Sequence, residues 1–292
     1  MTAKDEIAAL VVEFEKYGYV LSEELATILF LNQKLEKPVL LEGNPGVGKT
    51  AVAKCLASHH QTDLIRLQCY EGLDVNAAIY EWNYQKQLLN IKIMENETDR
   101  HAVSREIFGM EFLLQRPLLQ SITSPKPVVL LIDEVDRADE EFEAFLLEIL
   151  SDFQISIPEV GTVVAHHKPF VILTSNRTRE LSDALKRRCL YHWVDYPDFK
   201  KEVQILLKSL PDLDENLARQ VVLVVQELRD MKLNKSPGIA ESIDWARTLL
   251  ALDSLTLDKL TMENSLGAVL KSQDDIRKVK TDHLTRLADL IN

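Results

Sequence analysis

The sequence predicts an α/β fold with a parallel sheet, followed by a domain made only of helices. Five short apolar runs alternate with helical patterns as far as residue 194, and no strand pattern follows residue 197. Strands that alternate with helices favour a parallel sheet, because each helix carries the chain back to the edge where the next strand begins. We therefore predict an α/β domain over residues 1–197 and a helical domain over residues 198–292.

The spacing of apolar residues places the individual elements. Residues 7–37 have a helical pattern that breaks at Tyr17-Gly18-Tyr19, which predicts an N-terminal helical segment. The stretch 74–123 contains two helical patterns separated by the polar run 95–100, and residues 156–164 are typical of a hairpin. The predicted strands are 38–41, 64–69, 128–132, 169–174 and 190–194, and further helices are predicted over 50–57, 140–152, 199–210, 214–231, 239–252 and 257–270.

The composition argues against two classes of protein. The formal net charge of the 292-residue chain is −12, whereas proteins that bind phosphate backbones present basic surfaces, so we expect no nucleic-acid partner. No apolar run is long enough for a transmembrane segment, and the N-terminus is acidic rather than signal-like. Cys55, Cys69 and Cys189 are widely spaced, as expected for reduced and mostly buried thiols. Together these features favour a cytoplasmic protein.

A phosphate-binding loop joins the first predicted strand to the helix that follows it. Gly43-Asn44-Pro45-Gly46-Val47-Gly48-Lys49-Thr50 matches the pattern G-x-x-x-x-G-K-[ST] at every fixed position. Glycines let backbone N–H groups point at an anion, Lys49 supplies charge for the β- and γ-phosphates, and the Thr50 hydroxyl can bind Mg²⁺. The following helix presents its N-terminus to the phosphates, so the predicted nucleotide-binding segment extends to Ala51.

Two acids follow the third predicted strand. Asp133 and Glu134 come directly after the apolar run that ends at Ile132. Open α/β sheets bind ligands at the carboxyl ends of their strands, so Asp133 is expected to face the phosphate loop and help to hold Mg²⁺. Glu134 is placed to polarise a water for attack on the γ-phosphorus. Such a pair is more often a solvated loop, but a complete phosphate loop upstream favours nucleotide hydrolysis.

Asn and Arg residues farther along the chain have two interpretations each. Asn176 follows a predicted strand and either lies between the attacking water and the γ-phosphate or forms a turn. Arg187 and Arg188 have guanidinium groups suited to a phosphoryl transition state, or they belong to a solvated basic turn. Arg247 in the helical domain either reaches the nucleotide or extends along a helix surface.

Taken together, these motifs resemble those of AAA+ ATPases over nearly the whole chain. The loop at 43–50 is similar to a Walker A motif, residues 130–134 to Walker B, and Asn176 to sensor 1. Arg187 and Arg188 resemble the arginine-finger region, with both left as candidates, and Arg247 resembles the sensor 2 arginine. The resemblance implies hydrolysis of Mg·ATP, a five-stranded parallel core of order 5-1-4-3-2 and an all-α lid. It also implies catalytic roles for Lys49, Glu134, Asn176 and one of the two arginines.

Within AAA+ proteins the chain resembles the MoxR family and, more narrowly, its CoxD-like branch. The resemblance is carried by residues 79–85, 112–119 and 174–181 and most specifically by 183–193. The more common MoxR motif after the Walker B strand is Asp-Glu-Ile-Asn-Arg-Ala. At this position the chain has Asp133-Glu134-Val135-Asp136-Arg137-Ala138. The more common MoxR sequences also have Asp-Arg-Phe where this chain has Arg187-Arg188-Cys189. These two differences favour the CoxD-like branch and leave open which arginine is the finger.

This resemblance implies a ring, usually a hexamer, that acts as an ATP-driven chaperone. It implies a partner with a von Willebrand factor A domain and a client metalloenzyme, a molybdenum hydroxylase of the carbon monoxide dehydrogenase type. The alternative function is a nucleotide-gated assembly module with slow hydrolysis and no remodelling. The aromatic residues Tyr80, Trp82 and Tyr84 either line a pore or ring interface or pack under an insertion. The pairs His59-His60 and His166-His167 are expected at the surface.

Overall fold

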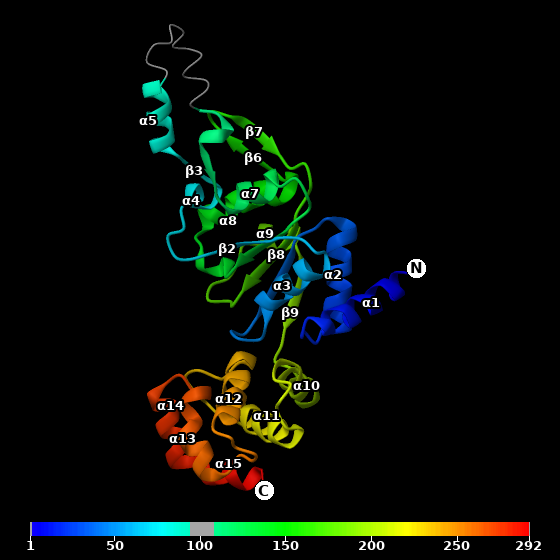
Figure 1. The fold of residues 1–292 in the computed structure, drawn as a ribbon, viewed down its shortest axis with the longest axis vertical. Helices are drawn as coiled ribbons and strands as arrows, with labels where there is room; N and C mark the ends of the chain where they lie inside the picture. Colours follow the sequence, from blue (N-terminus) through cyan, green and yellow to red (C-terminus); the bar gives the residue numbers. More distant parts are fainter. Residues whose placement is uncertain (1, 94–107, 292) are drawn as a thin grey trace. The chain divides into compact units, whose positions relative to one another are not determined.

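The computed structural model describes residues 2–93 and 108–291 of the chain (Figure 1). The predicted polar run 95–100 lies outside the described residues. The chain divides into two compact units, each described by itself below. The first, here named the loop unit, consists of Met1–Glu23, Gly43–Val52 and Trp193–Asn292, and the second, the sheet unit, of Glu24–Glu42 and Ala53–His192. The predicted domain division after residue 197 stays a prediction.

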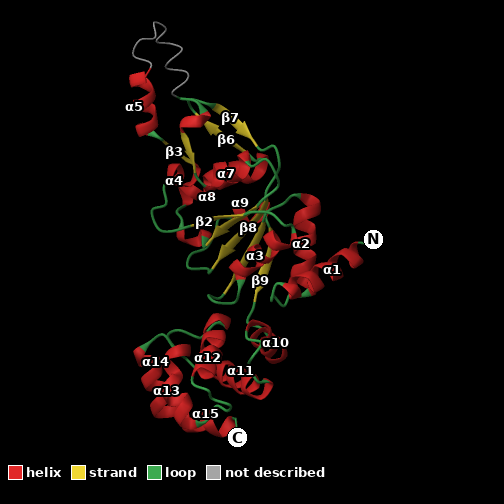
Figure 2. Cartoon of the chain, viewed as in Figure 1, coloured by secondary structure: helices red, strands yellow, loops and turns green. Residues whose placement is uncertain are grey.

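A five-stranded sheet has the strand order β2-β5-β8-β1-β9 (Figure 2). Counted along the chain these strands are 2-3-4-1-5, which is the predicted order 5-1-4-3-2 read from the opposite edge. The pairs β2–β5, β5–β8 and β8–β1 are parallel. The predicted fold class is therefore confirmed. The strands are β1 (Val39–Gly43), β2 (Leu64–Gln68), β5 (Val129–Asp133), β8 (Phe170–Ser175) and β9 (Leu190–Val194).

The central strands form because both of their faces are covered. Every residue of β1 and β5 is buried, which explains why they read as continuous apolar runs rather than as alternating ones. The edge strand β2 alternates buried and exposed positions over part of its length, as expected where one face meets water. Parallel pairing brings the carboxyl ends of β5 and β8 together, with Ile132 opposite Leu173. The residues that follow these two strands are thereby neighbours.

Helices of the sheet unit cover the sheet through one continuous hydrophobic core. Leu118, Leu119 and Ile122 on one helix and Phe142 and Leu146 on another are all fully buried against strand residues. The second of these helices begins where the Asp139 carboxylate accepts a hydrogen bond from the Phe142 N–H at 2.8 Å. The helices that lie wholly or mainly in this unit are α2 (Glu23–Leu35), α3 (Lys49–His59), α4 (Val75–Ile79), α5 (Tyr84–Ile93), α7 (Pro117–Thr123), α8 (Glu140–Asp152) and α9 (Asp183–Arg188), with 3₁₀ turns at Met110–Phe112 and Val135–Arg137.

Two small antiparallel sheets stand beside the main one. The predicted hairpin is present as β6 (Gln154–Ile157) and β7 (Gly161–Val164). The other pair, β3 (Tyr80–Trp82) and β4 (Leu113–Gln115), corrects the prediction of helix over this stretch. Alternate positions of a strand share a face, and the rings of Tyr80 and Trp82 accordingly meet edge-on with centroids 5.9 Å apart. Both rings pack against the core of the sheet unit, which favours the packing interpretation for these two aromatics.

The described chain is helical from residue 199 onward, as predicted. A second hydrophobic core lies around the fully buried Trp245, whose indole N–H donates to the Ser265 hydroxyl at 2.8 Å. A buried ion pair joins the Arg229 guanidinium to the Glu202 carboxylate at 2.6 Å. The helices of the loop unit are α1 (Ala3–Lys16), α10 (Phe199–Ser209), α11 (Glu215–Asp230), α12 (Ile239–Ala251), α13 (Lys259–Val269), α14 (Gln273–Lys278) and α15 (Leu284–Leu290), with a π-helical turn at Val279–His283.

The cysteines and one histidine show how burial shifts ionisation in this fold. Burial raises the pKa of Cys55 to about 11 and that of Cys189 to about 12, so both remain thiols at neutral pH. His60 corrects the prediction of a surface pair, because its ring stacks on Phe170 with centroids 4.4 Å apart. Burial lowers the pKa of His60 to about 4. In the described ranges, no helix is long and apolar enough to cross a bilayer.

Candidate active site

The phosphate loop in the loop unit has the backbone conformation that its glycines permit. Gly46 and Gly48 have φ angles of +77° and +94°, in the left-handed region that side chains disfavour. Gly43 ends β1, and a Cβ atom there would overlap the carbonyl oxygen of Val194. Helix α3 begins at Lys49, one residue before the predicted start. The loop is therefore a strand–loop–helix turn with its amides at a helix N-terminus, the arrangement that binds phosphates.

Lys49 lies inside this loop rather than in solvent. The residue is 6% exposed, and its ammonium donates to the carbonyl oxygens of Gly43 and Asn44 at 2.7 and 2.8 Å. Two of its donors thus hold the loop in its curled form. An ammonium has three donors on a flexible stem, so Lys49 can turn toward a phosphate from this position.

The N-terminus of α12 contacts the phosphate loop within the loop unit. The Ile239 N–H donates to the Gly46 carbonyl oxygen at 2.9 Å. Gly238 lies so close that a Cβ atom on it would be 2.8 Å from the Gly46 Cα. The Glu241 carboxylate accepts a hydrogen bond from the Gly238 N–H at 2.9 Å and fixes this turn. Neither of these contacts with the loop was predicted from the sequence.

The sheet unit holds the two predicted acids at the ends of its central strands. Asp133, the last residue of β5, is 2% exposed. Its Oδ1 accepts a hydrogen bond from the Thr174 hydroxyl at 2.5 Å, and its Oδ2 accepts from Arg66 Nε and Nη2 at 3.0 and 2.6 Å. The same Thr174 hydroxyl oxygen accepts from the Glu134 N–H at 2.9 Å. One threonine on β8 therefore fixes both a carboxylate and the backbone of the next acid.

Glu134 has an unusual backbone conformation. Its φ and ψ angles are 55° and 49°, a left-handed conformation that residues other than glycine adopt at a cost of about 1–2 kcal/mol. The hydrogen bond from its N–H to Thr174 compensates part of that cost. The Glu134 carboxylate is one-third exposed and forms an ion pair with Arg137 Nε at 2.7 Å. Strain of this kind concentrates at functional positions, where it aims a side chain.

A third buried acid positions Asn176. The Asp136 carboxylate accepts from the Asn176 N–H at 3.1 Å and from the Thr178 N–H at 2.8 Å. The neighbouring Cys69 thiol responds to these acids. Burial and the negative charges of Asp133, Asp136 and Glu134 raise its pKa to about 12. Asp133, Glu134 and Asn176 thus come together at one edge of the sheet. Thr174 and Asp136 were not predicted as site residues.

Glu42, another buried acid, precedes the phosphate loop. Its carboxylate accepts hydrogen bonds from the Ser175 hydroxyl at 3.3 Å and the Tyr191 hydroxyl at 3.1 Å. Burial and the Glu42 charge raise the pKa of Tyr191. In the register of the sheet, Glu42 is opposite Ser175. This network joins the end of β1 to the end of β8, next to Asn176, and was not predicted.

The predicted arginines differ in what they contact. Arg188 Nε donates to the Ser151 hydroxyl at 2.5 Å, which ties it to α8. The Arg187 side chain is exposed and makes no hydrogen bond or ion pair with any described residue. Arg247 is exposed and forms an ion pair with Asp244 at 3.0 Å. The structure therefore does not bring Arg187 or Arg188 into the cluster of Asp133, Glu134 and Asn176.

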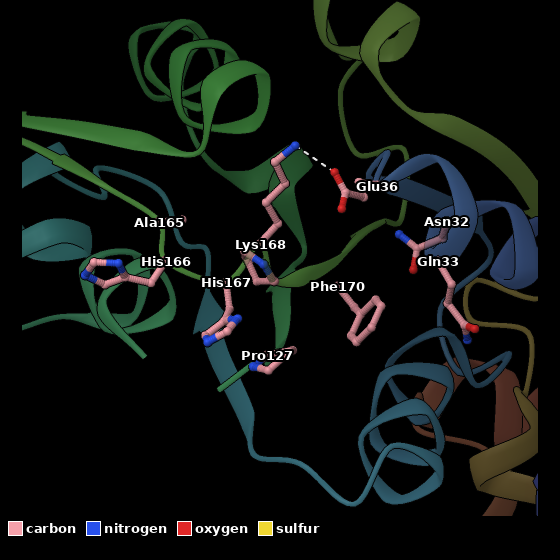
Figure 3. Close-up of a pocket in the computed structure, with 10 residues that line it drawn as sticks. Asn32, Gln33, Glu36, Pro127, Ala165, His166, His167, Lys168 and Phe170 are labelled. Atoms are coloured by element: carbon pink, nitrogen blue, oxygen red, sulfur yellow. Dashed lines mark hydrogen bonds and ion pairs between the residues drawn. The ribbon is translucent and has the colours of Figure 1, made fainter. Parts of the chain in front are cut away.

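A pocket of about 440 Å³ lies at the other edge of the sheet (Figure 3). Pro127 and Phe170 stand at the amino ends of β5 and β8, whereas the acids stand at the carboxyl ends. This pocket is therefore separate from Asp133 and Glu134. Its lining is Asn32, Gln33, Glu36, Pro127 and the run Ala165-His166-His167-Lys168-Pro169-Phe170.

The comparisons with known proteins now decide the family. A family model described as "ATPase family associated with various cellular activities (AAA)" matches residues 39–193, more than half of the chain. The chain is a member of this AAA family. The matched segment includes the phosphate loop, both acids, Asn176 and the two arginines of α9.

Individual relatives of this AAA protein are distant. An uncharacterized protein of Staphylococcus epidermidis is 26% identical over 259 residues, with 82% of this chain and 90% of that protein covered. The gas vesicle ATPase GvpN of Haloferax mediterranei is also 26% identical, with 84% and 72% covered. A solved structure of a Thermotoga maritima RuvB mutant matches with a TM-score of 0.51 at 16% identity, over 90% of this chain and 75% of that one. The last likeness concerns the fold alone.

Replacement of Thr174 by valine tests the connection between β5 and β8. Thr174→Val keeps the side-chain shape but leaves Asp133 Oδ1 and the Glu134 N–H without this partner. We expect the free energy of unfolding in urea to fall by about 1–3 kcal/mol, the usual cost of unsatisfied buried groups. Thr174→Ser retains the hydroxyl and serves as the control. Equal stability of the valine and serine variants would contradict the assigned role.

Gly238→Ala tests the contact between α12 and the phosphate loop. The added methyl group meets backbone atoms of Gly46 at 2.8 and 3.0 Å, so either the loop or the helix must move. We expect a loss of about 1–3 kcal/mol in unfolding free energy and weaker ADP binding by calorimetry. Gly267→Ala is the matched control, because a Cβ there meets no atom within 4 Å and alanine favours its helix. Unchanged stability and ADP affinity in Gly238→Ala would refute the contact.

Proposed function

We propose that this chain hydrolyses ATP with Mg²⁺ and uses the energy to remodel a client protein. The segment from Gly43 to Ala51 binds the nucleotide, with Lys49 at the β- and γ-phosphates. Glu134 acts as general base toward the attacking water, and Asn176 orients that water. Membership of the AAA ATPase family supports this assignment.

The observation that carries the proposal is the double role of Thr174. Its hydroxyl orients the Asp133 carboxylate and also anchors the strained backbone of Glu134. Two acids so fixed at a strand end, in a chain with a complete phosphate loop, suit a reaction that needs a metal and an activated water.

The residues present fit a magnesium ion. Asp133 and Thr50 provide the hard oxygen ligands that Mg²⁺ prefers, and among the described residues no cluster of three His, Cys, Asp or Glu could form an all-protein cage. When bound, Mg²⁺ would neutralise charge on the phosphates. Asp133 would orient the ion, and Thr50 would contribute its hydroxyl.

We propose that Arg187 serves a neighbouring copy of the chain. A guanidinium that completes a site in another subunit must be exposed and unengaged in its own subunit, and Arg187 is both within the described residues. Arg188 already donates to Ser151. We propose that the copies assemble into a ring, for which a hexamer is the expected form. Arg247 has its partner in Asp244, and we propose that it turns to the nucleotide only on binding.

The client and partner follow from the resemblance of the sequence to the CoxD-like branch of the MoxR family. We propose a cytoplasmic chaperone that matures a molybdenum hydroxylase of the carbon monoxide dehydrogenase type, together with a von Willebrand A-domain protein. The relative GvpN is a gas vesicle ATPase, which supports ATPase activity in this chain. The second candidate is a nucleotide-gated assembly module. A client that accelerates turnover favours remodelling, and a client without effect on turnover favours the module.

Glu134→Gln is the direct test of hydrolysis. The amide cannot accept a proton from water, so we expect ATP binding to persist while steady-state phosphate release falls by about 100-fold or more. Glu141→Gln on the exposed first turn of α8 is the matched control and should hydrolyse at the normal rate. Undiminished phosphate release in Glu134→Gln would remove Glu134 from the mechanism.

The two arginines of α9 can be separated in the same assay. Arg187→Ala is expected to lower turnover by about 1,000-fold, the scale of an arginine finger. Arg188→Ala is expected to lower thermal stability slightly and turnover by less than about tenfold, because it loses one exposed hydrogen bond. The reverse order of effects on phosphate release would assign the role to Arg188.

A further inference from the structure

Arg66 on β2 forms an ion pair with the buried Asp133. Both its Nε and its Nη2 donate to Asp133 Oδ2, at 3.0 and 2.6 Å. The pair is asymmetric in exposure, because the Arg66 side chain is 49% exposed and the Asp133 side chain only 3%. An aspartate so deeply buried needs compensation for its charge, and Arg66 supplies it.

With this contact in place, both oxygens of Asp133 are engaged. Oδ1 accepts from Thr174 and Oδ2 accepts the two Arg66 donors. The positive charge of Arg66 therefore lies against the same carboxylate that would hold a metal ion. Two cations at one carboxylate repel each other, and at a few ångströms in a partly buried site this repulsion is strong.

Arg66 makes a second side-chain contact, which lies within β2 itself. Its Nη2 also donates to the Gln68 side-chain oxygen at 2.5 Å. Gln68 is the residue opposite Asp133 in the parallel register of β2 and β5. Since half of the Arg66 side chain is exposed, its guanidinium can turn outward while the contact with Gln68 persists.

We propose that Arg66 is the resident counter-ion of Asp133 and that it releases the carboxylate when nucleotide-bound Mg²⁺ arrives. The proposal rests on the proposed function and adds a regulatory contact to it. Arg66 stabilises the metal-free state by neutralising Asp133, and for the same reason it opposes metal binding. Loss of Arg66 must therefore shift stability and metal dependence in opposite directions.

The test measures how much Mg²⁺ strengthens ADP binding. Calorimetry gives the ADP dissociation constant with Mg²⁺ and with EDTA, and their ratio is the metal dependence. For Arg66→Met we expect this ratio to rise about tenfold over that of the unaltered chain, because a competing charge is gone. Arg66→Lys keeps the charge and should change the ratio by less. Arg116→Met is the matched control, since Arg116 is a similarly exposed arginine of the sheet unit paired with Glu81.

Thermal unfolding in EDTA supplies the second readout. Arg66→Met should lower Tm by several degrees, since the buried Asp133 loses the ion pair with Arg66. In the background of Asp133→Asn the same change should have little effect, because a neutral amide needs no counter-ion. Equal losses of Tm in both backgrounds would overturn the counter-ion role.

The two readouts also separate this proposal from a structural role. If Arg66 only orients Asp133 as a metal ligand, Arg66→Met will lower the metal dependence of ADP binding, and that result would overturn the release step. An unchanged ratio would overturn it as well. Absence of ADP binding by the unaltered chain would overturn the proposed function and the release step with it, and the unfolding cycle would then still decide the counter-ion role.

Discussion

The hydroxyl of Thr174 is the contact on which the proposed chemistry depends. It donates to the Asp133 carboxylate and accepts from the Glu134 N–H, so one side chain on β8 sets the geometry of two residues at the end of β5. Parallel pairing of the strands brings these groups within reach, and the buried faces of β5 and β8 keep the pairing in register. Without the hydroxyl, the left-handed turn at Glu134 would lose its anchor.

The carboxyl edge of the sheet concentrates buried negative charge and compensates it with hydrogen bonds. The Asp133 carboxylate accepts hydrogen bonds from Thr174 and Arg66. The Asp136 carboxylate accepts from backbone N–H groups, and the Glu42 carboxylate accepts from two hydroxyls. Carboxylates held in this way are fixed in direction before any ligand arrives, which is the preorganisation that a metal and a water need. Arg66 neutralises the charge of Asp133. We propose that this ion pair opens when Mg²⁺ binds.

The elements that follow a local sequence pattern were predicted correctly. Strands β1, β5 and β8 read as continuous apolar runs because nearly all of their residues are buried. The strand order implied by the AAA+ resemblance is confirmed. The phosphate loop was found because its glycines and lysine have fixed spacing. Strand β3 was missed, because three residues are too few to show alternation.

The contacts within the site were beyond a single sequence for a different reason. Thr174 and Asp133 are 41 residues apart, and Arg66 and Asp133 are 67 apart. No periodicity in the chain links such positions, and they meet only because parallel pairing sets one strand end beside another. The approach of Gly238 to Gly46 is of the same kind. Residue types therefore led to the proposed chemistry, while the partners that orient these residues appeared only in the folded chain.

The most direct test of the account is phosphate release per chain from Mg·ATP, measured over a wide range of chain concentration. An ATPase whose site is completed by an arginine of the next subunit must assemble to work. We predict a rate per chain that rises with concentration to a plateau and is abolished by EDTA. A rate that is constant down to the lowest concentration would contradict the shared site, and no phosphate release at any concentration would contradict the account as a whole.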